Sequence, residues 1–232
     1  MEKKVIVVLL VFAFCSLPSF GLSLMGPPKA GLAEGQSSIG VDYSYSETKL
    51  KFSGFGITAI EEVETNMLFI NLGYGITEQC EGFVRLGVAD VKLEDFDGDS
   101  EFAYGFGTKV TFIDDENVSW GGLFQINWFQ GDDNFSGVNV EIDAYEIQIA
   151  AGPTYEAENM RIYGGPFLHF VDGDGDADFF GYPLGSFDVE EESVFGGYIG
   201  AGFDIADDSY LNVEFQFTGD AWAVGVGLGK KF

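Results

Sequence analysis

The C-terminal stretch YLNVEFQFTGDAWAVGVGLGKKF, residues 210–232, decides the fold of this chain. It divides around Thr218-Gly219-Asp220 into two runs in which apolar residues alternate with polar or small ones. The first run sets Leu211, Val213, Phe215 and Phe217 against Asn212, Glu214, Gln216 and Thr218, and the second sets Trp222, Val224, Val226, Leu228 and Phe232 against alanine, glycine and lysine. Because successive side chains of a strand point to opposite faces, each run predicts a β-strand with one apolar face.

The same alternation recurs from residue 38 onward and predicts about ten strands in all. Before the closing pair, the predicted strands are residues 38–46, 65–76, 80–91, 101–113, a run after the turn at 114–117, then 138–155, 160–171 and 193–205. Short polar turns alternate with longer, acidic connections, of which residues 47–64 and 172–192 are the longest. Such alternation predicts a sheet with short turns at one end and long loops at the other.

This pattern resembles the small bacterial outer-membrane β-barrel proteins, with Tyr74-Gly-Ile-Thr-Glu78 at a short turn and Phe232 as a terminal aromatic in phase with the apolar face. The resemblance covers residues 38–232. It implies an all-β fold: a single closed, antiparallel, up-and-down transmembrane barrel of about ten strands, with eight or twelve as the alternatives. Lipid offers the backbone no hydrogen-bond partner, so such a sheet must close on itself. A soluble β-sandwich would share the alternation but needs neither alternating loop lengths nor a terminal aromatic.

The resemblance also implies a location and partners. An even strand number puts both termini on the periplasmic side of a Gram-negative outer membrane. Phe232 in the closing strand would be the insertion signal that the barrel-assembly machinery reads. The apolar faces would contact outer-membrane lipid and lipopolysaccharide, and we expect a monomer. The candidate residues for the interfacial aromatic girdles are Tyr43, Tyr74, Trp120, Trp128, Tyr145 and Trp222.

Residues 1–21 have the organisation of an export signal, with a basic start, an apolar core and the small-x-small sequence Ser19-Phe20-Gly21. The apolar core is shorter than the roughly twenty residues that a spanning helix needs. Residues 22–37 are predicted to form a flexible leader before the barrel domain of residues 38–232. Removal of the signal would leave Cys80 as the only cysteine, so no internal disulfide is expected.

The charge balance excludes one class of partner. The chain has 38 acidic residues against 11 lysines and arginines, and its formal net charge is −27. Nucleic acid is therefore not expected to bind, because its phosphates would be repelled. We interpret the negative charge as an outer coat of acidic loops, which would share divalent ions with an anionic lipopolysaccharide surface.

The inward faces of the predicted strands carry charged and polar side chains. The expected lumen charge network is Asp42, Arg85, Lys109, Glu146, Arg161 and Glu214. In a narrow barrel, such groups pair with one another and fill the lumen. The alternative is a water-filled channel for small solutes, lined by the same charges. Many inward positions are glycine or alanine, which leaves space for either outcome.

The sharpest local motif is the run of alternate carboxylates Asp172, Asp174, Asp176 and Asp178. Alternate carboxylates separated by glycine can wrap a hard cation, and the run resembles the front of an EF-hand calcium loop. Ala177 replaces the turn glycine of that motif, and Pro183 stands where the bidentate glutamate is expected. The run is thus a candidate calcium site, with Asp95, Asp97 and Asp99 as a weaker second one, and a solvated acidic loop is the alternative. No other cofactor is expected.

The chain also resembles the ten-stranded omptin proteases of the outer membrane in having Asp95-Phe-Asp97 and the pair His169 and Asp172 in comparable loops. It lacks the Asp-x-His sequence of that family, and it has no Gly-x-Ser-x-Gly motif and no phosphate-binding loop. We therefore expect no enzyme activity. The leading functional prediction is a structural or surface-interaction barrel of the outer membrane, and the second is a narrow porin.

Overall fold

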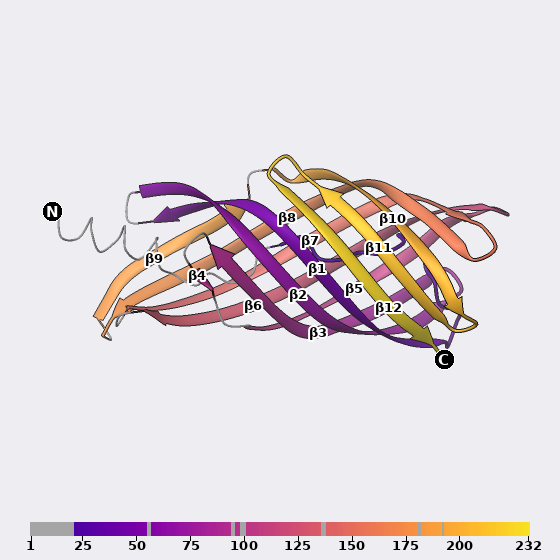
Figure 1. Cartoon of the computed structure of the whole chain (residues 1–232), viewed down its shortest axis with the longest axis horizontal. Helices are drawn as coiled ribbons and strands as arrows, with labels where there is room; N and C mark the ends of the chain where they lie inside the picture. The colour runs from indigo at the N-terminus through magenta and orange to yellow at the C-terminus, as the bar shows by residue number, and fades with distance from the viewer. Residues whose placement is uncertain are drawn as a thin grey trace.

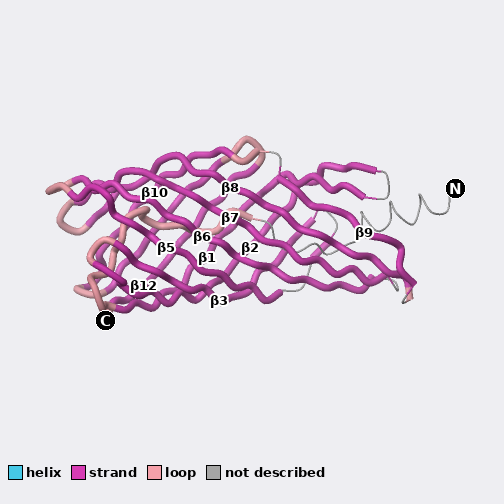
Figure 2. The backbone as a smooth tube through the Cα atoms, turned by 180° about the vertical axis from the view of Figure 1, so that it is seen from behind, coloured by secondary structure: helices cyan, strands magenta, loops and turns pink. Residues whose placement is uncertain are grey.

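The computed structural model describes residues 21–54, 57–93, 96–97, 101–135, 138–180, 182–191 and 193–232, and these form strands joined by turns (Figures 1 and 2). The strands are β1 Ser37–Gly54, β2 Ile57–Thr77, β3 Cys80–Leu93, β4 Phe96–Asp97, β5 Glu101–Asp114, β6 Val118–Phe135, β7 Val138–Glu156, β8 Met160–Phe179, β9 Tyr182–Glu191, β10 Phe195–Ala206, β11 Ser209–Phe217 and β12 Ala221–Lys231. Within this part of the chain, no helix is long and apolar enough to cross a membrane.

Ten of these strands close into an antiparallel barrel, as the sequence predicts. The ten are all the strands except β4 and β9, and each pairs with the next of the ten along the chain, so that β3 pairs with β5 and β8 pairs with β10. The sheet closes where β12 pairs with β1, from Ser38 opposite Lys231 to Thr48 opposite Ala221. The first and last strands therefore leave no open edge along this seam, which satisfies the backbone groups that lipid would leave without partners.

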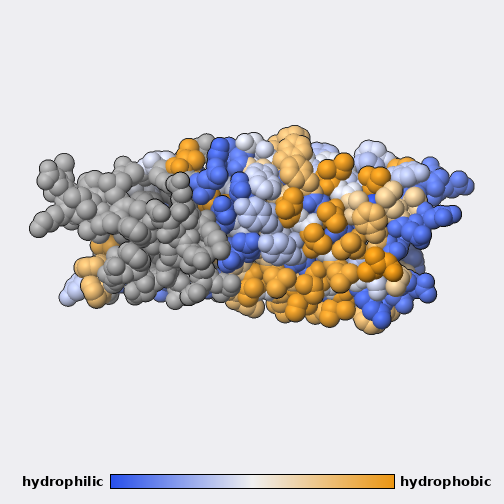
Figure 3. Space-filling model, in the orientation of Figure 1, coloured by the Kyte–Doolittle hydropathy of each residue, from blue (hydrophilic) through white to orange (hydrophobic). Residues whose placement is uncertain are grey.

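Apolar residues cover the outside of the barrel along this part, and the lumen contains the polar residues together with buried apolar clusters. On β2 the outward residues Leu68, Ile70 and Leu72 are about half exposed, whereas the inward residues Thr65 and Met67 are buried. Figure 3 shows the outward residues as a broad apolar band over the half of the visible face nearer the C-terminal end, with hydrophilic surface on both sides. A band of this kind, on a closed sheet, is the surface that contacts hydrocarbon in a transmembrane barrel.

The strands continue well beyond the predicted limits at the end opposite the C-terminus. The connection expected at residues 47–64 is largely the last part of β1 and the first part of β2, which pair with each other. The connection expected at 172–192 is the end of β8 followed by β9. There β9 pairs with both β8 and β1, so it occupies the wall beyond the ends of β10, β11 and β12. The predicted acidic loops are thus mainly strands. Outside the apolar band the outward residues are charged, as at Lys49, Glu62 and Glu190, and the apolar residues Leu50, Val63 and Val189 face inward. The acidic outward face is what made these strands resemble loops in the sequence.

The opposite end carries the four short turns between β2 and β3, β5 and β6, β7 and β8, and β10 and β11. The barrel begins and ends here: the Phe232 N–H donates to the Ser37 carbonyl at 2.8 Å. The ring of Phe232 is exposed at this end. Residues 1–20, which contain most of the predicted export signal, lie outside the described residues.

Candidate functional site

The lumen is not empty, because residues 21–32 run through it (Figure 2). This segment, predicted as part of a flexible leader, turns into the barrel before β1. Leu22, Ser23, Leu24 and Met25 are all nearly or fully buried, and so is Leu32 farther along. We call residues 21–32 the plug segment. It lies in the lumen, enclosed by the strands, so it is part of the folded barrel.

Inward glycines make room for the plug segment. A Cβ atom on Gly225 would lie 2.8 Å from the Leu24 Cδ1 atom and 3.1 Å from its Cβ atom. A Cβ atom on Gly121 would lie 2.5 Å from the Pro28 carbonyl oxygen. The absence of a side chain at these positions of β6 and β12 thus sets the path of the segment. The small inward residues noted in the sequence leave space that another part of the chain fills.

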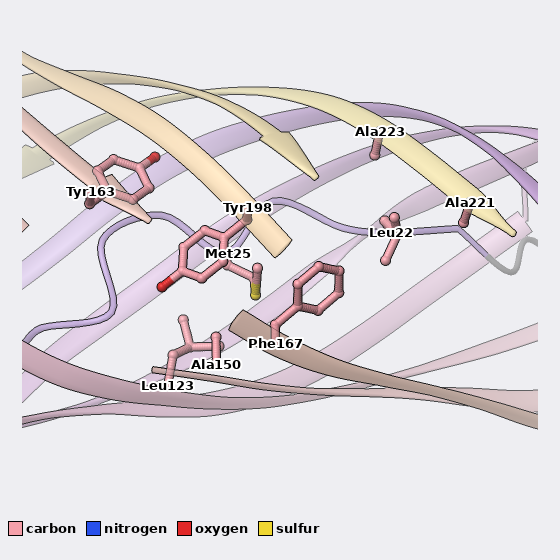
Figure 4. Close-up of a cluster of buried hydrophobic side chains, with 9 residues drawn as sticks. All are labelled: Leu22, Met25, Leu123, Ala150, Tyr163, Phe167, Tyr198, Ala221 and Ala223. Carbon is pink, nitrogen blue, oxygen red and sulfur yellow. The ribbon is translucent and has the colours of Figure 1, made fainter. Parts of the chain in front are cut away.

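The plug segment also packs against apolar side chains of the wall. Leu22 and Met25 join a buried cluster with Leu123, Ala150, Tyr163, Phe167, Tyr198, Ala221 and Ala223 (Figure 4). The Phe167 and Tyr198 rings in this cluster meet edge to face, with centroids 6.2 Å apart. Part of the lumen is therefore a packed core.

Barrel side chains bind the backbone amides of the segment. Two carboxylates each accept from two consecutive N–H groups: Glu214 from Met25 and Gly26, both at 3.0 Å, and Glu81 from Gly31 and Leu32 at 2.7 and 3.0 Å. The Ser44 and Thr111 hydroxyls accept from Leu24 and Ala30. The intervening Pro27 and Pro28 have no N–H to satisfy. A buried extended chain requires such partners, because its amides bond to no strand.

Ser23 is at the centre of the polar lumen. Its hydroxyl donates to the Glu146 carboxylate at 2.5 Å and accepts from the Arg85 guanidinium at 3.0 Å. It also accepts from the side-chain amides of Gln125 and Asn127 at 3.0 and 3.1 Å. These side chains come from β3, β6 and β7, so one hydroxyl of the plug segment joins three strands of the wall. Ser23 was not among the residues predicted from the sequence.

His169 on β8 lies between two buried carboxylates. Its Nε2 atom is 3.2 Å from a Glu146 oxygen, and its Nδ1 atom is 2.5 Å from a Glu191 oxygen. All three side chains are fully buried. Contacts at both ring nitrogens indicate that the imidazole holds the two carboxylates together across the lumen. Glu191 falls in the region predicted as a loop, and this explains why its role was missed.

The six residues of the predicted lumen charge network all lie on the inside of the barrel or at its mouth. Only Arg85 and Asp42 are within ion-pair distance of each other, and the other four contact residues outside the predicted network. Arg85 lies 3.6 Å from Asp42 and stacks on the Phe69 ring at 4.3 Å. Lys109 is 4.0 Å from Glu81, and Arg161 is 2.7 Å from Asp204. Glu146 and Glu214 bind the plug segment instead.

A cavity of about 70 Å³ remains beside the plug segment. Its lining includes Asp42, Arg85, Lys109, Glu81 and Asn212. A water molecule needs about 10–15 Å³ of such space, so the cavity accommodates only a few waters.

The candidate calcium ligands lie on β8 rather than in a loop. Asp172, Asp174 and Asp176 are exposed on the outer face, alternating with the buried Gly173 and Gly175. A strand spaces alternate residues about 6.6 Å apart, so it does not gather their oxygens around one ion. No group of three or more potential ligands with metal-binding geometry occurs in the described ranges. For the second candidate, Asp95 and Asp99 lie outside those ranges.

The omptin-like pair is also separated. His169 and Asp172 are three residues apart on one strand, so His169 faces the lumen and Asp172 faces outward. Asp172 is instead 3.5 Å from the Tyr145 hydroxyl on the outer surface. The two residues do not form the acid–base pair that the resemblance implies.

No protein-family model and no curated protein matches the chain. Solved structures do. The translocator domain of the autotransporter NalP from Neisseria meningitidis aligns at 9% identity over 87% of this chain and 90% of its own, with a TM-score of 0.51. An outer-membrane channel from Pseudomonas putida F1 aligns at 10% identity over 91% and 100% of the two chains, also at 0.51. The outer-membrane protease OmpT from Escherichia coli aligns at 10% identity over 90% and 99%, again at 0.51.

Fold and comparisons together define the class: a closed β-barrel of the outer-membrane type. The similarity covers 87% to 91% of this chain, but at these identities it shows the fold alone. The three similar proteins are described as a translocator domain, a channel and a protease, so the shared fold selects none of these activities.

Proposed function

We propose that the protein is an integral barrel of the bacterial outer membrane with a structural or surface-interaction role, closed to diffusion by its own plug segment. One observation carries this proposal: residues 22–25 are buried in the lumen, where Ser23 and the amides of Met25 and Gly26 are bound by the wall. A narrow barrel whose lumen contains a packed and hydrogen-bonded segment has no continuous aqueous path.

Conductance in planar lipid bilayers tests the closed lumen. The chain without the predicted signal, residues 22–232, is refolded and inserted into the bilayer, and it is expected to give no stable unitary current steps. Stable steps from the full chain would instead support the narrow porin. A matched preparation of a known open porin shows that insertion and recording work.

The outer face supplies the surface for interaction. Asp143 on β7, Asp174 on β8 and Asp188 on β9 stand opposite one another in one row across three strands, and all are exposed. The neighbouring row of outward residues, on β6, β7 and β8, contains Trp128, Tyr145 and Asp172. Acidic side chains next to interfacial aromatics are suited to sharing divalent ions with an anionic lipopolysaccharide layer. Calorimetry with millimolar calcium tests this part, and the absence of heat would reject the ion-mediated contact.

A further inference from the structure

We propose that the lumen is a binding site for a peptide without regular secondary structure, that the chain's own residues 22–32 occupy it, and that a separate peptide of the same sequence can replace them. The proposal goes beyond the closed barrel, because it concerns whether the closing segment is a ligand of the wall rather than a fixed part of it. The ligand class is a peptide with small and apolar side chains, in which two consecutive backbone N–H groups can donate to one carboxylate.

The contacts are those of ligand recognition rather than of a sheet. The plug segment is not a strand of the barrel: it bends at Pro28 and Lys29, and Gly26 has a φ of 72°. Its amides at Leu24, Met25, Gly26, Ala30, Gly31 and Leu32 bond to side chains of the wall. Side chains that bind backbone amides recognise a segment whose N–H groups are not already paired within a helix or a sheet. The pair of prolines between the two bound stretches fixes two φ angles before binding.

The wall is shaped for this peptide. Gly225 and Gly121 leave the space that Leu24 and Pro28 occupy, and the Ser23 hydroxyl accepts hydrogen bonds from Arg85, Gln125 and Asn127. Two further groups bind its basic side chain: the Lys29 ammonium is 3.0 Å from the Glu156 carboxylate and 3.0 Å from the Ser119 hydroxyl. Shape, amides and charge are all complementary over one segment.

The segment is attached to the barrel wall at one described point. Beyond Leu32 the chain leaves through the exposed residues Ala33 and Glu34, and β1 then begins at Ser37. Cleavage between Glu34 and Gly35 would convert the plug segment into a separate peptide without cutting a strand. In this design the barrel folds with the segment in place and is cut only afterwards. The test therefore does not depend on whether a variant that lacks residues 22–34 can fold.

The experiment inserts a protease recognition sequence between Glu34 and Gly35, refolds the full processed chain in detergent, and cleaves it. A fluorescent peptide with the sequence of residues 22–34 is then added in excess. We expect the label to enter the barrel in a saturable one-to-one manner as the original segment is released, with the β-sheet circular dichroism unchanged. An intact cleaved barrel that retains its segment and takes up no label would overturn the proposal.

Substitutions in the wall and in the peptide show whether binding occurs at this site. Glu81→Gln and Glu214→Gln are each expected to weaken peptide binding about tenfold, a factor that corresponds to about 1.4 kcal/mol. Glu158→Gln, in the exposed turn between β7 and β8, is the matched control and leaves binding unchanged. A labelled peptide with Met25→Pro and Gly31→Pro lacks two of the bound amides and should fail to compete. Equal binding by all of these variants would mean non-specific adsorption and would contradict the proposal.

The two proposals fail separately. Unitary currents from the uncut chain would reject the closed barrel even if peptide exchange occurs. A silent chain whose cleaved segment does not exchange would leave the barrel closed but remove the peptide-binding site.

Discussion

His169 shows how one residue connects the lumen. Its imidazole contacts Glu146, which binds Ser23 of the plug segment, and Glu191, which lies at the end of β9. Two buried carboxylates facing each other without a donor between them would repel, so the histidine is needed for the wall to close at this level. The alternation of His169 with Leu168 and Phe170 agrees with its inward position, but a single sequence does not identify its partners from β7 and β9.

His169→Leu is expected to lower the free energy of unfolding by about 3–5 kcal/mol, because it leaves Glu146 and Glu191 buried without their shared partner. His169→Gln retains a donor and should recover part of that loss. Urea titration of the refolded barrel in detergent, followed by tryptophan fluorescence, measures both variants. Equal stability of the leucine variant and the unchanged chain would show that the contacts contribute nothing.

At the scale of elements, the sequence predicts the membrane part of each strand and fails outside it. Alternation sets Leu68, Ile70 and Leu72 outward because only lipid demands a continuous apolar face. Beyond the band the outward face becomes charged, as at Lys49 of β1 and Asp174 of β8, while the inward face contains Leu50 and Ala177. The apolar side of the alternation is therefore reversed there, and the sequence pattern resembles that of an acidic loop. The plug segment was missed for a related reason, since a sequence does not show which distant residues fill the space above Gly121 and Gly225. The inward glycines themselves are the signal that could have revealed it.

Gly225→Val is expected to displace the plug segment while the barrel remains folded, because the new side chain would occupy the space of Leu24. In the double variant Gly225→Val, Leu24→Ala, the smaller side chain at position 24 leaves room for the valine, so the plug segment should dock again. Limited proteolysis within residues 22–34 measures this: cleavage increases severalfold in the single variant and returns towards the original rate in the double variant. Equal protection in the single variant would mean that this glycine does not position the segment.

The closing strand permits a separate test of assembly. The Phe232 ring is 67% exposed at the end of the barrel and lies 5.5 Å from the Lys230 ammonium, so it contributes little to packing. Phe232→Ala should therefore change the free energy of unfolding by no more than about 0.5 kcal/mol. If Phe232 is the insertion signal, the same variant lowers the amount of barrel found in the outer membrane of cells severalfold. Phe217→Ala, which removes an outward phenylalanine of β11, is the control and should insert normally.

For the whole molecule, plug and wall make one closed unit, so removal of the plug segment should create a conducting state. An extended chain occupies about 5 Å by 10 Å in cross-section, judged from strand and sheet spacings, and its removal leaves a path of that size. At the level of Ser23 the wall would retain the carboxylates of Glu146, Glu191 and Glu214 against Arg85 and His169, and the chain as a whole has a net charge of −27. We therefore expect the cleaved and washed barrel to give unitary currents with a reversal potential that shows preference for cations in a salt gradient. Readdition of the peptide of residues 22–34 should abolish the currents, whereas Glu146→Gln with Glu214→Gln should reduce the cation preference. A washed barrel that has lost its segment and still carries no current would show that wall side chains alone close the lumen.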